Sequence, residues 1–366
     1  PLHTNFSLNG SGEFLGLYAP GSTTPLSSYE PEFPNQFKNV AYGISESNPG
    51  DVGYLMAPTP SSPNGSVFLG FVADTQFSIH RGFYNEPVTV EVTTATEGAA
   101  GSLPSASNGV LYTEPVVIDS TTILRAIAVK DRYVSSNVDT QTYVFVSDVK
   151  EQPAMDARVT EAPEYIDEIE EGLGASLPAL SIVVDEEAFF GPEGIYRQYE
   201  RTGREAEVPI SLEYFSPTDE NDTFHLNAGI RIHGGNARSH PKKPFRLYFR
   251  EEYSGGNGEL EHSLYEGSKV DSFEQLILRG GGHDGWSLAD RFGGTDSDIP
   301  AHASFMRDQF LRKTEADMGL LTPLGKYVHV YINAAYWGIY DMHERPNATF
   351  FADHLGGAKD DWDVIH

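Results

Sequence analysis

The sequence predicts a multidomain protein in which two β-sandwich-like modules at the N-terminus precede a domain of mixed α+β structure. The chain has 366 residues, which is enough for two or three domains of about 150 residues each. Its 36 glycines and 23 prolines indicate many turns between short strands. Strand-like runs fill the first 148 residues, whereas amphipathic helical patterns appear only after them.

Composition narrows the possible partners and cofactors. Hydrophobic residues make up 39% and aromatic residues 12%, so each domain can build a core. The formal net charge of −28 argues against nucleic acid or an anionic membrane as a partner, because both require a basic surface. The absence of cysteine excludes disulfides and Cys-ligated zinc. No apolar run approaches the roughly 18 residues of a membrane span.

Residues 1–62 are predicted to form short strands between turns. The apolar run Glu13–Tyr18 follows Gly10-Ser11-Gly12, and Pro20-Gly21 ends it. The segment LHTNFSLNGSGEFLGLYAPGSTTPLSSYEPEFPNQFKNVAYG resembles the later strands of a bacterial lamin-tail domain, which is an immunoglobulin-like sandwich. The resemblance implies a partial domain whose first strands precede residue 1. The alternative is an unassigned edge of a β-sandwich.

Residues 66–148 are predicted to form a second β module. Thr122–Val129 is a strand-like run, and Tyr143–Val146 is another. The segment GVLYTEPVVIDSTTILRAIAVKDRYVSSNVDTQTYVF resembles a fibronectin-associated module that also occurs at the C-terminus of chitobiases. TEGAAGSLPSASNG replaces the usual hairpin, so we expect one strand to be missing or replaced by a loop. The module is predicted to act as a spacer, with contact to a polysaccharide as the alternative.

Residues 149–176 are predicted to form an acidic linker and a helix. Pro163 suits the first turn of a helix, and the apolar residues recur at helical spacing up to Leu173. Acidic residues occupy the opposite face, which we interpret as a solvated surface.

A cationic segment follows the predicted strands of residues 177–185, 208–215 and 228–233. Gly234 and Gly235 would allow an anion to approach the backbone, and five basic residues follow them: Arg238, Lys242, Lys243, Arg246 and Arg250. Side chains alternate along a strand, so only one of Lys243 and Arg246 can point into a given cleft. The pattern is no Walker A loop, and alone it also fits an exposed edge strand protected by lysine.

The rest of the chain adds a strand, a helix, a hairpin and the start of another helix. Their sequences are FEQLILRGGGHDGW, ASFMRDQFLRKTEADMGL, YVHVYINAAYWGIYDMHERP and NATFFADHL. Within the first helix, Arg307 and Asp308 are predicted to form a buried structural pair. Asp360, Asp361 and Asp363 are predicted to lie in a solvated loop.

The ordered set of these motifs, together with AGIRIHGGNARSHPKKPFRLYFR, resembles the CotH family of atypical protein kinases, which is named for a spore coat protein. The resemblance covers residues 177–366 and implies the α+β first lobe (N-lobe) of a kinase-like domain, with ATP and Mg²⁺ as cofactors. It also implies phosphorylation of Ser or Thr on extracellular or envelope proteins. Large secreted bacterial relatives often carry both N-terminal modules, so we expect a secreted or cell-surface protein.

The resemblance implies specific nucleotide contacts. Gly234, Gly235 and Asn236 would lie in the loop beside the nucleotide, and Lys243 or Arg246 would contact phosphate. Most relatives have lysine where Arg246 stands. Glu344 would orient the basic residue or touch the nucleotide, unless it forms a structural ion pair.

The catalytic carboxylates and the Mg²⁺ ligands of this family lie in the second lobe, downstream of the hairpin. We therefore assign no catalytic residue and no metal ligand here, and we expect this piece to bind nucleotide weakly without turnover. The alternative is a non-catalytic surface scaffold or adhesion protein that retains the kinase-like lobe.

Overall fold

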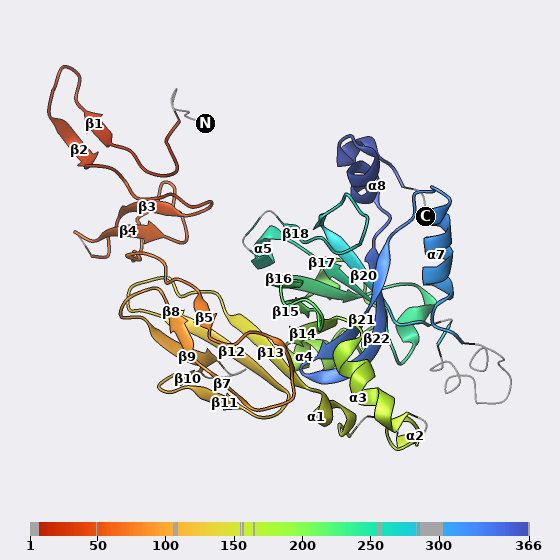
Figure 1. Ribbon diagram of the computed structural model, residues 1–366. Coiled ribbons are helices and arrows are strands. Elements are labelled where there is room, and N and C mark those ends of the chain that lie inside the picture. Colours follow the sequence, from red (N-terminus) through yellow and green to blue (C-terminus); the bar gives the residue numbers. More distant parts are fainter. Residues whose placement is uncertain are drawn as a thin grey trace. The chain divides into compact units, whose positions relative to one another are not determined.

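A computed structural model describes residues 7–48, 50–104, 109–153, 155, 157–163, 165–254, 256, 258–282, 284–285 and 303–364. The protein is mostly β-structure with few helices (Figure 1). The chain divides into two compact units. Unit 1 comprises residues 1–76, 92–113 and 126–139, and unit 2 comprises residues 77–91, 114–125 and 140–366. None of the helices in the described ranges has the length and apolar character of a membrane span.

The N-terminal part of unit 1 consists of two antiparallel hairpins. β1 (Leu15–Tyr18) pairs with β2 (Pro25–Tyr29), and β3 (Ala41–Ile44) pairs with β4 (Val52–Leu55). Aromatic rings pack between these strands and the following segment, with centroids 4.5–5.7 Å apart: Tyr29, Phe37, Tyr42, Tyr54 and Phe71. The expected β-rich character is present, and the lamin-tail resemblance stays a prediction.

The rest of unit 1 is also built from short strands. It contains β8 (Val92–Thr94), β9 (Ala100–Pro104), β10 (Gly109–Leu111) and parts of β5 (Thr75–Phe77) and β12 (Thr122–Val129). β9 pairs antiparallel with β10 and with β12. The predicted strand over residues 122–129 is confirmed with both its ends.

Unit 2 begins with strands from the same stretch of sequence. β7 (Val88–Val90) pairs antiparallel with β11 (Val116–Ile118), and β6 (Gly82–Tyr84) pairs parallel with β13 (Asp139–Phe145). Three helices follow: α1 (Val146–Lys150), α2 (Ala157–Thr160) and α3 (Ile166–Ala175). All residues of β13 are buried.

The centre of unit 2 is a closed seven-stranded barrel with the strand order β14-β15-β16-β17-β20-β22-β21. β14 and β21 pair parallel, and all other neighbours pair antiparallel. The strands are β14 (Ala179–Val184), β15 (Val208–Phe215), β16 (Thr223–Ile232), β17 (Phe245–Tyr248), β20 (Gln275–Arg279), β21 (Gly325–Ile332) and β22 (Ala335–Glu344). The predicted strand over residues 208–215 is confirmed with both its ends.

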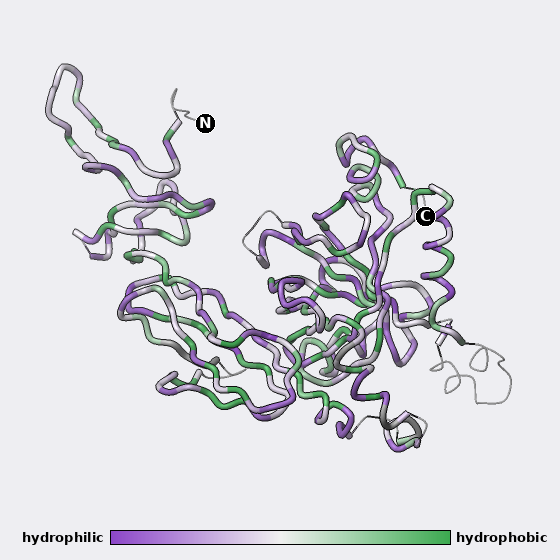
Figure 2. The backbone as a smooth tube through the Cα atoms, viewed as in Figure 1, coloured by the Kyte–Doolittle hydropathy of each residue, from purple (hydrophilic) through white to green (hydrophobic). Residues whose placement is uncertain are grey.

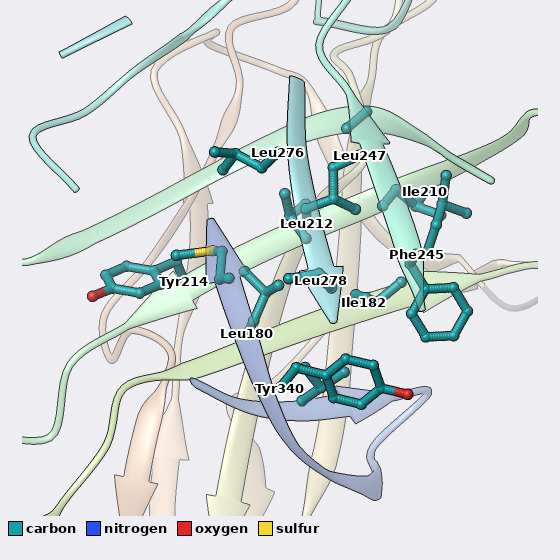
Figure 3. Packing of buried hydrophobic residues seen from close by; sticks show 14 of the residues in the cluster. Leu180, Ile182, Ile210, Leu212, Tyr214, Phe245, Leu247, Leu276, Leu278 and Tyr340 are labelled. Atoms are coloured by element: carbon teal, nitrogen blue, oxygen red, sulfur yellow. The ribbon is translucent and has the colours of Figure 1, made fainter. Parts of the chain in front are cut away.

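Alternate residues of each strand fill the barrel (Figure 3), as the two-residue period of a strand requires. The side chains that meet there are fully buried: Leu180, Ile182, Leu212, Phe245, Leu247, Leu276, Leu278 and Tyr340. The intervening residues therefore point outward, and among them are Arg231, Arg246 and His343.

Shorter elements surround the barrel. They are α4 (Glu186–Phe190), the 3₁₀ turns η1 (Arg204–Ala206), η2 (Asn236–Ser239) and η4 (Lys359–Asp361), α5 (Glu251–Ser254), the pair β18 (Leu260–Glu261) and β19 (Ser272–Phe273), α7 (Arg307–Asp317) and α8 (Ala348–Leu355). Asp185 caps α4 by accepting from the N–H of Ala188, and Asn347 caps α8 by accepting from the N–H of Phe350. The aspartates of η4 are exposed, as predicted.

Helix α7 packs on the barrel through its charged face. Arg312 of α7 pairs with Asp341 of β22. Most residues of this helix are hydrophilic (Figure 2). Its two large apolar side chains are exposed to solvent, Phe310 by 69% and Leu311 by 60%. The predicted pair of Arg307 with Asp308 is wrong, because neighbouring residues of a helix point about 100° apart. Arg307 pairs with Asp284 instead.

Candidate functional site

The outer face of the barrel carries a cavity of about 380 Å³ beside the ends of β16 and β17. This volume lies within the range of roughly 300–1,000 Å³ that is usual for small-molecule sites. Among the residues that the structure describes, five arginines and no carboxylate line the cavity. The lining residues are Arg201, Thr202, Gly203, Arg231, Ile232, His233, Gly234, Arg238, Arg246, Tyr248 and Arg345. We call this region the arginine cavity.

Strand register creates the arginine cavity. Arg231 of β16 lies directly opposite Arg246 of β17, so the two outward-pointing side chains share one row of the sheet. Arg345 directly follows β22. The cavity is thus assembled from segments that are more than a hundred residues apart in sequence, within a protein whose net charge is −28.

Acidic groups or backbone carbonyls hold Arg201, Arg231 and Arg238 in place. Arg231 pairs with Glu207 at 2.6 Å, and Arg201 pairs with Glu193. Arg238 donates hydrogen bonds to three backbone carbonyl oxygens at 2.5–2.7 Å. These contacts fix the positions of the three guanidinium groups.

Arg246 has no such carboxylate partner among the described residues. Its Nη2 lies 3.1 Å from Nδ1 of His233, and its Nε is buried without a hydrogen-bond partner there. Burial and the nearby arginines, Arg246 foremost, lower the pKa of His233 to about 3. The imidazole is therefore neutral at pH 7, and its Nδ1 accepts from Arg246 without compensating the charge. Burial and Arg246 also lower the pKa of Arg345. This excess of positive charge favours an anionic ligand.

The glycine loop between β16 and β17 borders the arginine cavity at one residue. Gly234 lines it with φ at +88°, a backbone conformation that residues with side chains rarely adopt. Gly235 faces open space, and Asn236 begins η2 without lining the cavity. Of the three predicted loop contacts, the structure therefore brings only Gly234 to the cavity wall.

Lys243 and Arg246 occupy different environments. Lys243 is only 5% exposed, and its Nζ donates to the carbonyl oxygens of Arg238 at 2.8 Å and His240 at 3.1 Å. The same Nζ lies 4.3 Å from the ring centroid of Tyr199. Arg246 lines the cavity instead. Of these two residues, Arg246 is the one that lines the cavity, and a phosphate contact at either residue stays a prediction.

Glu344 lies at the end of β22, outside the arginine cavity. It is 3% exposed and accepts a hydrogen bond from the N–H of Leu324 at 2.8 Å. Nε2 of His354 lies 2.8 Å from its other oxygen. These contacts tie β22 to the segment before β21 and to α8. A contact from Glu344 to nucleotide stays a prediction.

A second polar group lies between the barrel and α7. Arg279 at the end of β20 pairs with Asp308 of α7 at 2.5 Å, and Arg312 lies 2.8 Å from the same carboxyl group. Burial raises the pKa of Asp341, the other partner of Arg312, to about 6. The sequence motifs were not predicted to bring Arg279 and Asp308 together. A signal was present, because a basic residue ends the strand and an acid lies in the first turn of the next helix.

The glycine run after β20 allows the backbone there to lie close to Phe305, just before α7. Gly281 has φ at +75°, and a Cβ there would lie 1.9 Å from the ring of Phe305. Replacing Gly281 with alanine is expected to destabilise the protein by at least about 1 kcal/mol, since strain and clash combine. Chemical denaturation measures the change. Gly235→Ala is the matched control, because no heavy atom of a residue other than its two chain neighbours lies within 4 Å of its Cβ position. Equal stabilities of both variants would contradict the prediction.

Comparison with known protein families agrees with the motifs in the sequence. No curated protein matches the chain. Residues 79–140 match the chitobiase/beta-hexosaminidase C-terminal domain. Residues 230–365, which contain the glycine loop, β17, β20, α7 and the β21–β22 hairpin, match the family described as CotH kinase protein. The predicted resemblances to these two families are thereby confirmed over those residues.

Proposed function

We propose that residues 177–366 form the nucleotide-binding lobe of a CotH-type protein kinase, and that the arginine cavity holds the phosphates of ATP. The observation that carries the proposal is a cavity with five arginines and no carboxylate, located mostly within the residues that match a kinase family. The complete protein would transfer phosphate to Ser or Thr of an extracellular or envelope protein. We further propose that it is secreted or cell-surface bound.

The order of the strands supports this proposal. β16, β17, β20, β22 and β21 are antiparallel neighbours, and α7 lies between β20 and β21 in sequence. A glycine loop joins the first two strands, the third strand ends in Arg279, and α7 supplies Asp308. Protein kinases place a glycine-rich loop over the phosphates and use an ion pair between a strand lysine and a helix glutamate. The pair of Arg279 with Asp308 is the candidate counterpart here.

The chemical role of these residues is binding and positioning. Arg246 and Arg345 would pair with phosphate oxygens, and Gly234 leaves its backbone accessible to the ligand. Mg²⁺ supplies charge neutralisation to a kinase when it is bound. Within the described ranges, no three acidic or histidine side chains are grouped to hold a metal ion, so we derive no catalytic step through Mg²⁺.

Replacing Arg246 and Arg345 together with alanine is expected to abolish stabilisation by ATP. At an ATP concentration about ten times Kd, the melting temperature of the unchanged protein should rise by roughly 3–6 °C. The double variant should show no rise, because it lacks the two guanidinium groups that are proposed to pair with the phosphate oxygens. Differential scanning fluorimetry across an ATP series measures the effect.

Arg197→Ala is the matched control, because Arg197 is exposed in the same unit and does not line the cavity. The control should retain the full rise with ATP. A rise that persists in the double variant would place ATP elsewhere. No rise in the unchanged protein at millimolar ATP would favour the scaffold alternative.

A further inference from the structure

The walls of the arginine cavity are poor in surfaces that could hold a nucleobase. Tyr248 is the sole aromatic ring among the lining residues apart from the imidazole of His233. Its ring is covered by guanidinium groups, with Arg231 at 4.3 Å and Arg250 at 4.9 Å from the centroid. Tyr248 is only 6% exposed. A base that stacks on an aromatic side chain needs an open face, and Tyr248 offers none.

Apolar contact is equally scarce in the cavity. Ile232 is the one aliphatic lining residue, and it is 5% exposed because its side chain faces the barrel interior. Sites for flat, largely apolar groups are usually lined by hydrophobic and aromatic side chains. Among the residues that line this cavity, positive charge predominates over apolar surface.

The arrangement of the arginines suits a chain of phosphates. Arg201, Arg231 and Arg238 are anchored by their own partners, and Arg246 lies among them opposite Arg231. The guanidinium group of Arg246 can bind two oxygens of one phosphate, and the anchored arginines add positive charge and their remaining N–H groups around it. A ligand with several linked phosphates can therefore contact more of these groups at once than a monophosphate can.

We propose that the arginine cavity recognises the polyphosphate chain of its ligand and not the base. This rests on the proposed function, in which the same cavity holds the phosphates of ATP. Nucleoside triphosphates with different bases and inorganic tripolyphosphate then bind with similar affinity. Affinity decreases as phosphates are removed from the ligand, and it weakens as added salt screens the charges.

Isothermal titration calorimetry on the intact chain tests the proposal, with ATP, GTP, tripolyphosphate, AMP and adenosine at one ionic strength and without divalent metal. The dissociation constants of ATP, GTP and tripolyphosphate are expected to agree within about threefold. AMP is expected to bind at least about tenfold more weakly, because it offers one phosphate, and adenosine should not bind. Arg246→Ala should weaken the binding of ATP and of tripolyphosphate by the same factor, whereas Arg197→Ala should change neither dissociation constant.

The outcomes separate this inference from the proposed function. ATP binding that is at least tenfold tighter than tripolyphosphate binding, or measurable binding of adenosine, would overturn base-independent recognition and leave nucleotide binding intact. Binding of none of the five compounds would overturn both. If Arg246→Ala leaves the binding of tripolyphosphate unchanged, the anion binds at another surface and the inference is refuted. Arg246→Lys keeps the positive charge, so it should lose less affinity than Arg246→Ala. It should still bind more weakly than the unchanged protein, since lysine lacks the planar guanidinium group that binds two oxygens at once.

Discussion

Replacing Arg81 with methionine is expected to lower the free energy of unfolding by about 3–5 kcal/mol, because it leaves a buried carboxylate without its counter-charge. That carboxylate belongs to Glu213 of β15, which is fully buried. Glu213 accepts from Nε of Arg81 at 2.8 Å and from the N–H of Thr142 at 3.0 Å. Burial raises the pKa of Glu213, and the charge of Arg81 opposes this rise.

Urea unfolding of unit 2 measures the effect. Lys313→Met is the matched control in the same unit, because the Lys313 side chain is 72% exposed and its surface pair with Asp317 should contribute about 0–1 kcal/mol. The double variant Arg81→Met with Glu213→Leu should recover most of the lost stability, since it removes both buried charges together. A loss below 1 kcal/mol for Arg81→Met alone would show that water reaches Glu213.

Glu207→Gln is expected to cost a similar amount, about 3–5 kcal/mol, because Glu207 holds several cations at one fully buried carboxyl group. Arg231, Arg250 and Arg204 pair with it at 2.6–2.8 Å, and the hydroxyl of Tyr253 donates to it at 2.9 Å. Burial alone would raise the pKa of Glu207, but the hydrogen bonds from Arg250, Tyr253 and Arg231 outweigh it and lower the pKa.

The lowered pKa fixes the pH dependence of this effect. The folded protein keeps Glu207 ionised at pH values where the unfolded chain already binds a proton. Its stabilising contribution is therefore complete above the unfolded pKa of about 4.3 and is lost as the pH falls through the lower folded pKa. The difference in the free energy of unfolding between Glu207→Gln and the unchanged protein should be constant from pH 8 to 5 and should narrow below about pH 4. Glu205→Gln, an exposed neighbour, should match the unchanged protein throughout. A gap that narrows already at pH 6 would contradict the assignment.

Sequence patterns predicted the local structure better than the long-range structure. The strand over residues 208–215 was predicted from apolar residues that recur with the period of a strand, and the strand over residues 122–129 from a run of β-forming residues; both are confirmed. The contact between Arg81 and Glu213 joins residues 132 positions apart, and no local pattern reports it. The orientation of α7 was equally inaccessible, because its amphipathic pattern does not reveal that the charged face packs on the barrel.

In the candidate site, too, local features were predicted from the sequence and features that depend on strand pairing were not. Gly234 and Arg246 were predicted from local chemistry, and both line the arginine cavity. Arg345 and Arg231 were missed, since they join the cavity only through the pairing of β16, β17, β20 and β22. Lys243 was predicted on the same ground as Arg246, as a basic residue that follows the glycine loop. It lies just before β17, however, and its amino group donates to backbone carbonyls.

The closure of the barrel by β14 and β21 bears on how the protein can be synthesised. β14 pairs with β15 soon after both leave the ribosome, but its other edge waits for β21, which begins at Gly325. At a translation rate of roughly 5–20 residues per second, this delay is on the order of ten seconds. Throughout that interval the nascent chain presents an unpaired strand edge, which is a template for pairing with other chains. The order of the strands along the chain therefore leaves one edge of β14 open to pairing with other chains until β21 has been synthesised.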